Sequence, residues 1–202
     1  MYPLKKYAFL LIGFTRCQSP PNNPPQTAVE SQEVYHFDES SLPRWSSFEN
    51  PTAAKGQGGK DNKGAKGHAF ERWKAGEEKV LLDTDGSGVV QRIWLTVPTR
   101  DTASLHTLRI NMYWDGAASP AVDAPLGDFF GNVWGKTTAF ETHYFSNPEG
   151  RSFVSILPMP FRNGARITLR NTTGKDINHI FYDVNFTKKP VAETALYLHA
   201  LQ

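Results

Sequence analysis

The sequence predicts an all-β protein, a single antiparallel jelly roll or β-sandwich that follows an unstructured N-terminal tail. Segments rich in β-branched and aromatic residues recur about every ten residues from position 78 onward, with turn-forming residues between them. Apolar and polar residues alternate at 108–114, as they do in a half-buried strand. No segment keeps a helical period over about three turns. Together these observations indicate a sandwich.

Each strand is expected where apolar residues alternate or cluster between turns. These segments are 79–83, 89–97, 108–114, 142–145, 153–157, 166–170 and 179–187. In the last segment, one face is shared by Ile180, Tyr182, Val184 and Phe186. Turns are expected at 38–41, 85–88, 115–116, 147–150, 163–164 and 173–174.

The composition limits the classes of function. With 202 residues, the chain has room for one domain of ordinary size and a tail. Aromatic residues make up 12% of the chain, which fits an aromatic-rich β protein or a carbohydrate site. A net charge of +2 is too small to indicate a nucleic-acid partner.

Metal and disulfide chemistry are not supported. The single cysteine, Cys17, excludes an intrachain disulfide and a cysteine-based zinc cluster. The six histidines show neither HExxH nor HxH spacing. We therefore expect no metal and no cofactor.

The N-terminus has the features of a targeting segment. Lys5 and Lys6 precede a short apolar run at 8–14, which is far too short to span a bilayer. Cys17 follows, and then a stretch rich in Pro, Asn and Gln. This arrangement resembles a bacterial lipoprotein signal, in which the cysteine is acylated. We expect export to the periplasm or cell surface, with a lipid anchor at Cys17; an ordinary cleaved signal or an unprocessed tail is the alternative.

The domain division follows from these patterns. We expect a signal and tether at 1–26, a linker at 27–47 and the jelly roll at 48–190. Residues 191–202 end in an apolar run without a polar tail, so we expect them to be the truncated start of a following element.

Glycine and lysine dominate residues 55–67. A phosphate-binding P-loop needs the spacing GxxxxGK[ST] between a strand and a helix, and that pattern is absent here. A nucleotide site is therefore excluded. A ligand-proximal loop and a solvated linker both remain open.

The segment 125–131 (PLGDFFG) has the composition of a shaped loop. Its proline fixes φ at about −65°, and its glycines allow positive φ values that other residues avoid. Its aspartate is followed directly by two phenylalanines. A carboxylate can accept hydroxyl hydrogen bonds from a sugar while rings cover the C–H face of that sugar. The alternative is a turn with a core Phe pair and a surface Asp.

No catalytic machinery follows from the residues themselves. Glycoside hydrolysis commonly uses two carboxylates, and the candidates are Glu49, Asp115, Asp128 and Glu141. Their spacing in sequence does not bring any chosen pair together. A serine nucleophile lacks the GxSxG elbow, because the serine at 86–88 is expected in a hairpin turn.

Several motifs in order resemble the first half of glycoside hydrolase family 172, which includes α-D-fructofuranosidases and difructose dianhydride I synthases. They are SSF at 46–48, GSGVVQRIWLT at 86–96, YWDG at 113–116, APLGDFFG at 124–131 and PMPF at 158–161, followed by ARI at 165–167. The resemblance implies a jelly-roll subunit, a trimer-based homo-oligomer and active sites shared between subunits. It also implies retaining chemistry on furanosides, with one Glu as nucleophile and another as acid/base.

In this family both catalytic glutamates lie in the second half, in segments resembling WGEGD and GTGTEDYF. Neither segment occurs in these 202 residues, so we expect no catalytic residue here and no activity of the chain alone. The expected ligand is a furanose-containing oligo- or polysaccharide. Its contacts are assigned to Asp128, Phe129, Phe130 and to the loop that runs from Glu49 and Asn50 to Asp61 and Asn62. The alternative function is a non-catalytic surface module that binds a glycan or a partner.

Overall fold

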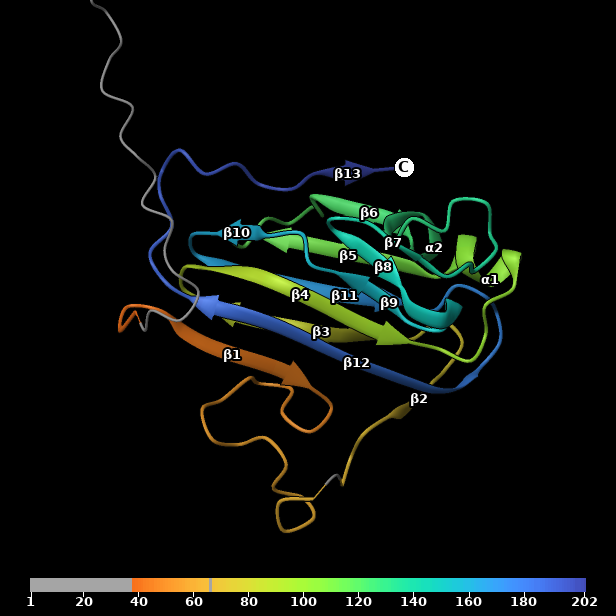
Figure 1. The fold of residues 1–202 in the computed structure, drawn as a ribbon, viewed down its shortest axis with the longest axis horizontal. Helices are drawn as coiled ribbons and strands as arrows, with labels where there is room; N and C mark the ends of the chain where they lie inside the picture. Colours follow the sequence, from red (N-terminus) through yellow and green to blue (C-terminus); the bar gives the residue numbers. More distant parts are fainter. Residues whose placement is uncertain (1–37, 66) are drawn as a thin grey trace, which may run out of the picture. The chain divides into compact units, whose positions relative to one another are not determined.

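The computed structural model describes residues 38–65 and 67–202 (Figure 1). The expected signal and tether, with Cys17, and most of the expected linker lie outside the described residues. The described chain forms two β-sheets packed face to face, with two short α-helices, α1 (Thr102–Thr107) and α2 (Leu126–Phe129), and one 3-10 turn, η1 (Pro148–Gly150). The predicted β-sandwich is therefore confirmed. Neither α-helix in the described part has the length or apolar composition needed to cross a bilayer.

The larger sheet carries the elements that matter for the site. Its strand order is β1 (Leu42–Ser47), β12 (Ile177–Lys188), β4 (Gly88–Thr96), β9 (Phe153–Ser155), β8 (Phe145–Asn147) and β7 (Phe140–Glu141). Two further strands join it, β10 (Met159–Phe161) on β4 and β2 (Glu71–Trp73) on β12. Figure 1 shows β1, β12 and β4 side by side.

The smaller sheet has the order β13 (Ala200–Leu201), β6 (Val122–Pro125), β5 (Arg109–Trp114), β11 (Gly164–Arg170) and β3 (Glu78–Asp85). Within the described residues, the one parallel pair is β13 with β6. The expected turn after β5 is present, because Asp115 and Gly116 have φ values of 57° and 75°. Two successive positive φ values are the geometry of a type I′ turn, which Asp-Gly favours.

Alternation along β12 decides which side chains enter the core. Ile180, Tyr182, Val184 and Phe186 are at most 4% exposed, as predicted for one shared face. Burying an apolar side chain of this size stabilises the fold by roughly 1.5–3 kcal/mol. The intervening residues, Phe181, Asp183 and Asn185, therefore point to the outer face of the larger sheet.

The structure differs from the sequence prediction at the expected linker. β1 occupies its last six positions and pairs with β12 from Leu42 opposite Lys188 to Ser47 opposite Asp183. The buried Ser46 hydroxyl also donates a hydrogen bond of 2.7 Å to the carbonyl oxygen of Leu81 in β3. This strand has no apolar alternation, so the long-range pairing, rather than a local pattern, makes it a strand.

The last residues pack on the sandwich. Trp114 Nε1 donates a hydrogen bond of 2.9 Å to the carbonyl oxygen of Leu198, and β13 pairs with β6. The side chains of Tyr197 and Leu198 pack against the core. The C-terminal run is therefore stabilised in two ways: its backbone forms hydrogen bonds with the edge strand β6, and its apolar side chains are partly buried against the core.

Candidate functional site

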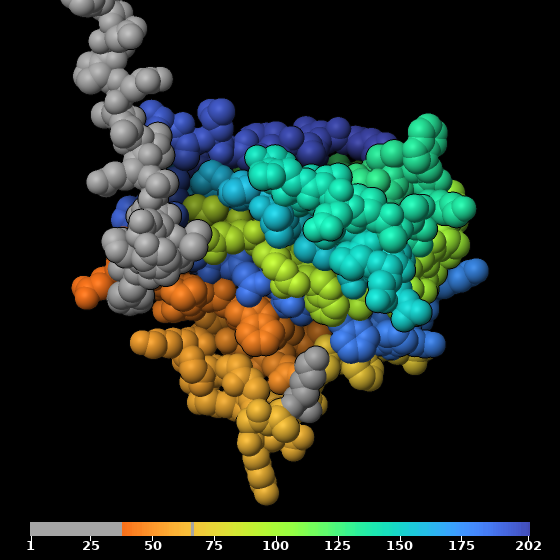
Figure 2. Space-filling view, viewed as in Figure 1, coloured from red at the N-terminus to blue at the C-terminus, as the bar shows by residue number. Residues whose placement is uncertain are grey.

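A cavity of about 500 Å³ opens where β1 ends beside β12. Its wall combines aromatic rings, two carboxylates and the glycine-rich loop: Trp45, Ser47, Phe48, Glu49, Gly58, Gly59, Gly64, Ala65, His68, Ala69, Trp94, Phe181, Tyr182 and Asp183. We call this cavity the cleft. Figure 2 shows the same face in space-filling form, with β1 in orange, β12 in blue and β4 in yellow-green.

Strand register places three of these side chains in neighbouring positions on the outer face. Asp183 of β12 lies between Ser47 of β1 and Trp94 of β4. Trp45 lies two positions before Ser47 on the same strand and is 49% exposed. Half-exposed aromatic rings beside polar groups are a usual composition for a ligand site.

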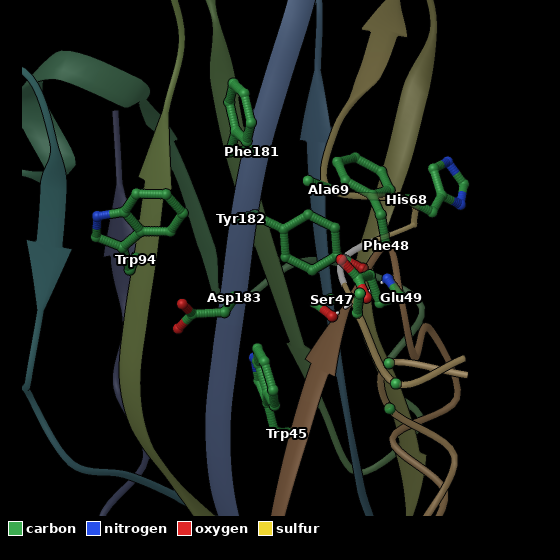
Figure 3. Close-up of a pocket in the computed structure, with 14 residues that line it drawn as sticks. Trp45, Ser47, Phe48, Glu49, His68, Ala69, Trp94, Phe181, Tyr182 and Asp183 are labelled. Atoms are coloured by element: carbon green, nitrogen blue, oxygen red, sulfur yellow. Dashed lines mark hydrogen bonds between the residues drawn. The ribbon is translucent and has the colours of Figure 1, made fainter. Parts of the chain in front are cut away.

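Phe48 forms the inner wall of the cleft. Its ring stacks on His68 at 5.8 Å between centroids and meets the ring of Tyr182 edge-on at 4.6 Å. Figure 3 shows Phe48 between these two rings. Burial raises the pKa of Tyr182, so this phenol stays neutral across the ordinary pH range.

A charge cluster around the buried Lys79 lies against this wall. Lys79 Nζ lies 5.7 Å from the centroid of the Phe48 ring and donates hydrogen bonds to Glu71 and Glu77. Glu71 Oε1 lies 3.2 Å from His68 Nε2. The cluster therefore links a buried strand residue to a side chain that lines the cleft.

Glu49 supplies an unused acceptor. Its Oε1 atom is buried and has no hydrogen-bond partner among the described residues. A carboxylate oxygen without a partner is costly, and a ligand hydroxyl that donates to it would remove the cost. Asp183, the other acid of the cleft, accepts a hydrogen bond from Arg92 Nη1, which also bonds Asn185.

Residues 38–194 match the family model described as the first β-sandwich domain of GH172. The chain belongs to GH172. This is a glycoside hydrolase family, so the recognition made from the sequence motifs is confirmed, and carbohydrate is the general class of ligand. A comparison with curated proteins gave no match.

In this GH172 domain the expected sugar-contact residues fall in two separate places. Glu49 lines the cleft, and the exposed residues Asp61 and Asn62 belong to the loop that also supplies Gly58 and Gly59 to the cleft. Asn50 is 8% exposed, and its amide bonds the carbonyl oxygens of Trp45 and Ala54 while its Oδ1 accepts from the Ala54 amide. Asn50 therefore holds the start of the loop.

Asp128 and Phe129 line a different groove of about 400 Å³, which α2 forms with residues near β13. Asp128 is 17% exposed, and its Oδ1 lies 3.3 Å from His106 Nδ1. Phe130 is fully buried and packs on Phe129 and Phe153, so the structure gives this ring a core role. The segment expected as a shaped loop contains the short helix α2. Leu126 and Phe130, four positions apart, are both fully buried in the core.

Sequence reasoning missed most of the cleft of this GH172 domain. Trp45, His68, Trp94, Phe181 and Asp183 were not among the expected site residues. The signal available was the alternation itself, since Phe181 and Asp183 flank the buried Tyr182 on β12. Residues 38–65 and 67–202 contain no cluster of three His, Cys, Asp or Glu side chains that could hold a metal ion.

Proposed function

We propose that this GH172 domain binds a furanose-containing oligo- or polysaccharide in the cleft. The observation that carries the proposal is the unpartnered buried oxygen of Glu49 in a cavity that also exposes the ring of Trp45. A carboxylate recognises hydroxyl groups, and an aromatic face covers the C–H side of a sugar ring. Family membership supports carbohydrate as the ligand class.

We further propose that the chain alone does not hydrolyse this ligand. Retaining glycoside hydrolysis uses two carboxyl groups about 5–5.5 Å apart, one as nucleophile and one as acid/base. In the cleft, Asp183 is ion-paired with Arg92, which leaves Glu49 as the acid with a free oxygen. The proposal rests on the sequence, in which neither segment that resembles the family's two glutamate motifs occurs.

Calorimetric titration of the full chain tests this function. The ligands are a fructo-oligosaccharide and an arabino-oligosaccharide of equal length, and the variants are Trp45→Ala and Glu49→Gln. We expect each variant to weaken binding about tenfold or more, because each removes one of the two recognition elements. Trp134→Ala is the matched control, since Trp134 is 88% exposed and lies outside the cleft.

Two results would contradict the proposal. Equal loss of binding in Trp134→Ala and Trp45→Ala would show that the cleft is not the specific binding site. Turnover of an aryl furanoside by the purified chain would contradict the absence of hydrolysis.

The second candidate function is a non-catalytic surface module that binds a glycan or a partner. The exposed ring of Trp45 and the unpartnered oxygen of Glu49 favour it, because both can bind a glycan without taking part in hydrolysis. Binding of non-furanose glycans as tight as that of furanosides, without hydrolysis, would support this candidate over a furanoside-specific domain.

Oligomer formation, export and lipid attachment at Cys17 stay predictions. The intact mass of the mature protein from its native source tests the last two, because signal removal lowers the mass and a lipid adduct on Cys17 raises it. Light scattering on the purified protein tests the expected trimer-based assembly.

A further inference from the structure

Two arginines near the end of β4 have no acidic partner among residues 38–65 and 67–202. Arg100 follows β4, and Arg151 precedes β9, which pairs with β4. Within the described residues, the ion pairs of up to 4.0 Å use other arginines. Two uncompensated guanidinium groups therefore occur on neighbouring segments.

Thr96 joins these two residues. Arg100 Nη2 donates a hydrogen bond of 2.9 Å to Thr96 Oγ1, and that hydroxyl donates one of 2.6 Å to the carbonyl oxygen of Arg151. Arg100 Nε is buried and has no hydrogen-bond partner in the described chain. Burial and the positive charge of Arg151 both lower the pKa of Arg100, although a guanidinium stays protonated at neutral pH. The arrangement thus costs free energy that a nearby negative charge would recover.

Thr96, which bonds Arg100, lies beside residues that line the cleft. In the strand register, Thr96 lies directly opposite Phe181, and Trp94 lies two positions earlier on the same face of β4. Both Phe181 and Trp94 line the cleft. Phe181 also contacts Phe70, which is 52% exposed, at 5.2 Å between centroids. The aromatic surface formed by Phe181 and Phe70 therefore lies beside Thr96, the residue that bonds Arg100.

We propose that Arg100 and Arg151 form an oxyanion subsite at this end of the cleft, and that the glycan bound there carries a carboxylate, sulfate or phosphate group. This inference rests on the proposed binding of carbohydrate in the cleft. The planar guanidinium fork matches the two oxygens of such a group, and charge-assisted hydrogen bonds are the stronger kind. The ring surface of Phe181 and Trp94 contacts the sugar while the arginines hold its anionic substituent.

Paired ligands test the subsite. The full chain is titrated with a neutral oligosaccharide and with a uronate-bearing oligosaccharide of equal length. We expect the wild type to bind the acidic ligand about tenfold more tightly, with an advantage that shrinks as salt screens the charges. Arg100→Gln and Arg151→Gln are each expected to remove this preference and leave the affinity for the neutral ligand unchanged. Arg170→Gln, which changes an exposed arginine of β11, is the control and should keep the preference.

A second measurement separates this proposal from the proposed function. The Nε–Hε resonances of Arg100 and Arg151 are followed by NMR while sodium sulfate is added to the chain without any sugar. We expect both resonances to shift and the Arg170 resonance to stay. This readout does not depend on sugar binding, so failure of the arginine subsite and failure of the cleft as a sugar site give different results.

Four outcomes would overturn the proposal. Equal affinity for the two oligosaccharides, together with sulfate-induced shifts, would make the subsite one for an adventitious ion only. Absence of sulfate-induced shifts would remove the subsite itself. A preference that survives in both arginine variants would place the recognition elsewhere. Salt-sensitive self-association that Arg100→Gln abolishes, without any preference for the acidic sugar, would assign the arginines to an acidic surface of another protein chain.

Discussion

Lys79 Nζ lies 2.7 Å from Glu71 Oε2, although only 8% of the Lys79 side chain is exposed. Glu77 accepts a second hydrogen bond from the same ammonium group at 3.1 Å. Burial by itself lowers the pKa of Lys79, but the hydrogen bonds to Glu71 and Glu77 outweigh it and raise that pKa. This ion pair, in which only Lys79 is buried, supports the wall of the cleft through Phe48 and His68.

Replacing Lys79 by Met should therefore destabilise the fold. Two carboxylates lose their shared partner, and both are about a third exposed, so water compensates part of the loss. We expect the free energy of unfolding in urea to fall by about 1–3 kcal/mol. Lys175→Met, at an exposed lysine, should change it by less than about 0.5 kcal/mol. Equal effects of the two substitutions would contradict a structural role for the buried pair.

Asp115 should be the most sensitive turn position. Its Oδ1 accepts hydrogen bonds from the backbone amides of Arg162, Asn163 and Gly164, at 2.9, 2.7 and 3.3 Å, and its φ of 57° is unfavourable for most residues. We expect Asp115→Ala to lower the free energy of unfolding by about 2–4 kcal/mol, because three amides lose their acceptor and alanine is strained there.

Asp115→Asn is the matched variant, because asparagine keeps one acceptor oxygen and tolerates positive φ. We expect a loss of about 1 kcal/mol. A loss as large as that of Asp115→Ala would show that the negative charge, rather than the acceptor geometry, is what stabilises the turn.

Acid should destabilise the protein in part through Asp115. Burial alone raises the pKa of this carboxyl, but hydrogen bonds from Asn163, Tyr197, Arg162 and Gly164 hold it below the ordinary value. A depressed pKa contributes stability above the unfolded-state value, about 3.9, and that contribution disappears as the pH falls through the folded-state value. Urea unfolding between about pH 6 and pH 2.5, a range that includes that value, should show a shallower decline for Asp115→Asn than for the wild type. Parallel curves would contradict this linkage.

Gly88 and Gly86 flank the turn between β3 and β4 and should respond differently to alanine. A Cβ atom at Gly88 would lie 2.5 Å from the carbonyl oxygen of Thr187 and 2.8 Å from Phe161, and the oxygen belongs to a paired strand. We expect Gly88→Ala to cost about 2–3 kcal/mol in thermal or urea unfolding. At Gly86 the space is open and only the φ of 79° is unfavourable, so Gly86→Ala should cost about 1 kcal/mol. A larger loss at Gly86 would show that turn strain, rather than close packing, governs this connection, which joins the two sheets and is not the hairpin expected from the sequence.

The sequence by itself determined the sandwich and its central strands. Alternation along 108–114 and 179–187 marked β5 and β12, and Asp115-Gly116 marked the turn after β5. These signals are local, because a period of two and a residue that tolerates positive φ are legible within a few positions. The motifs also carried the resemblance to GH172, which the family match confirmed.

Only the tertiary structure decided where the cleft lies. β1 has no alternating pattern and becomes a strand because it pairs with the far end of the chain in β12. That pairing brings Trp45 and Glu49 beside Asp183 and Trp94, and it separates Glu49 from Asp128, which lines another groove. Strand pairing over such sequence distances depends on the register of whole sheets, and no window of neighbouring residues contains that information.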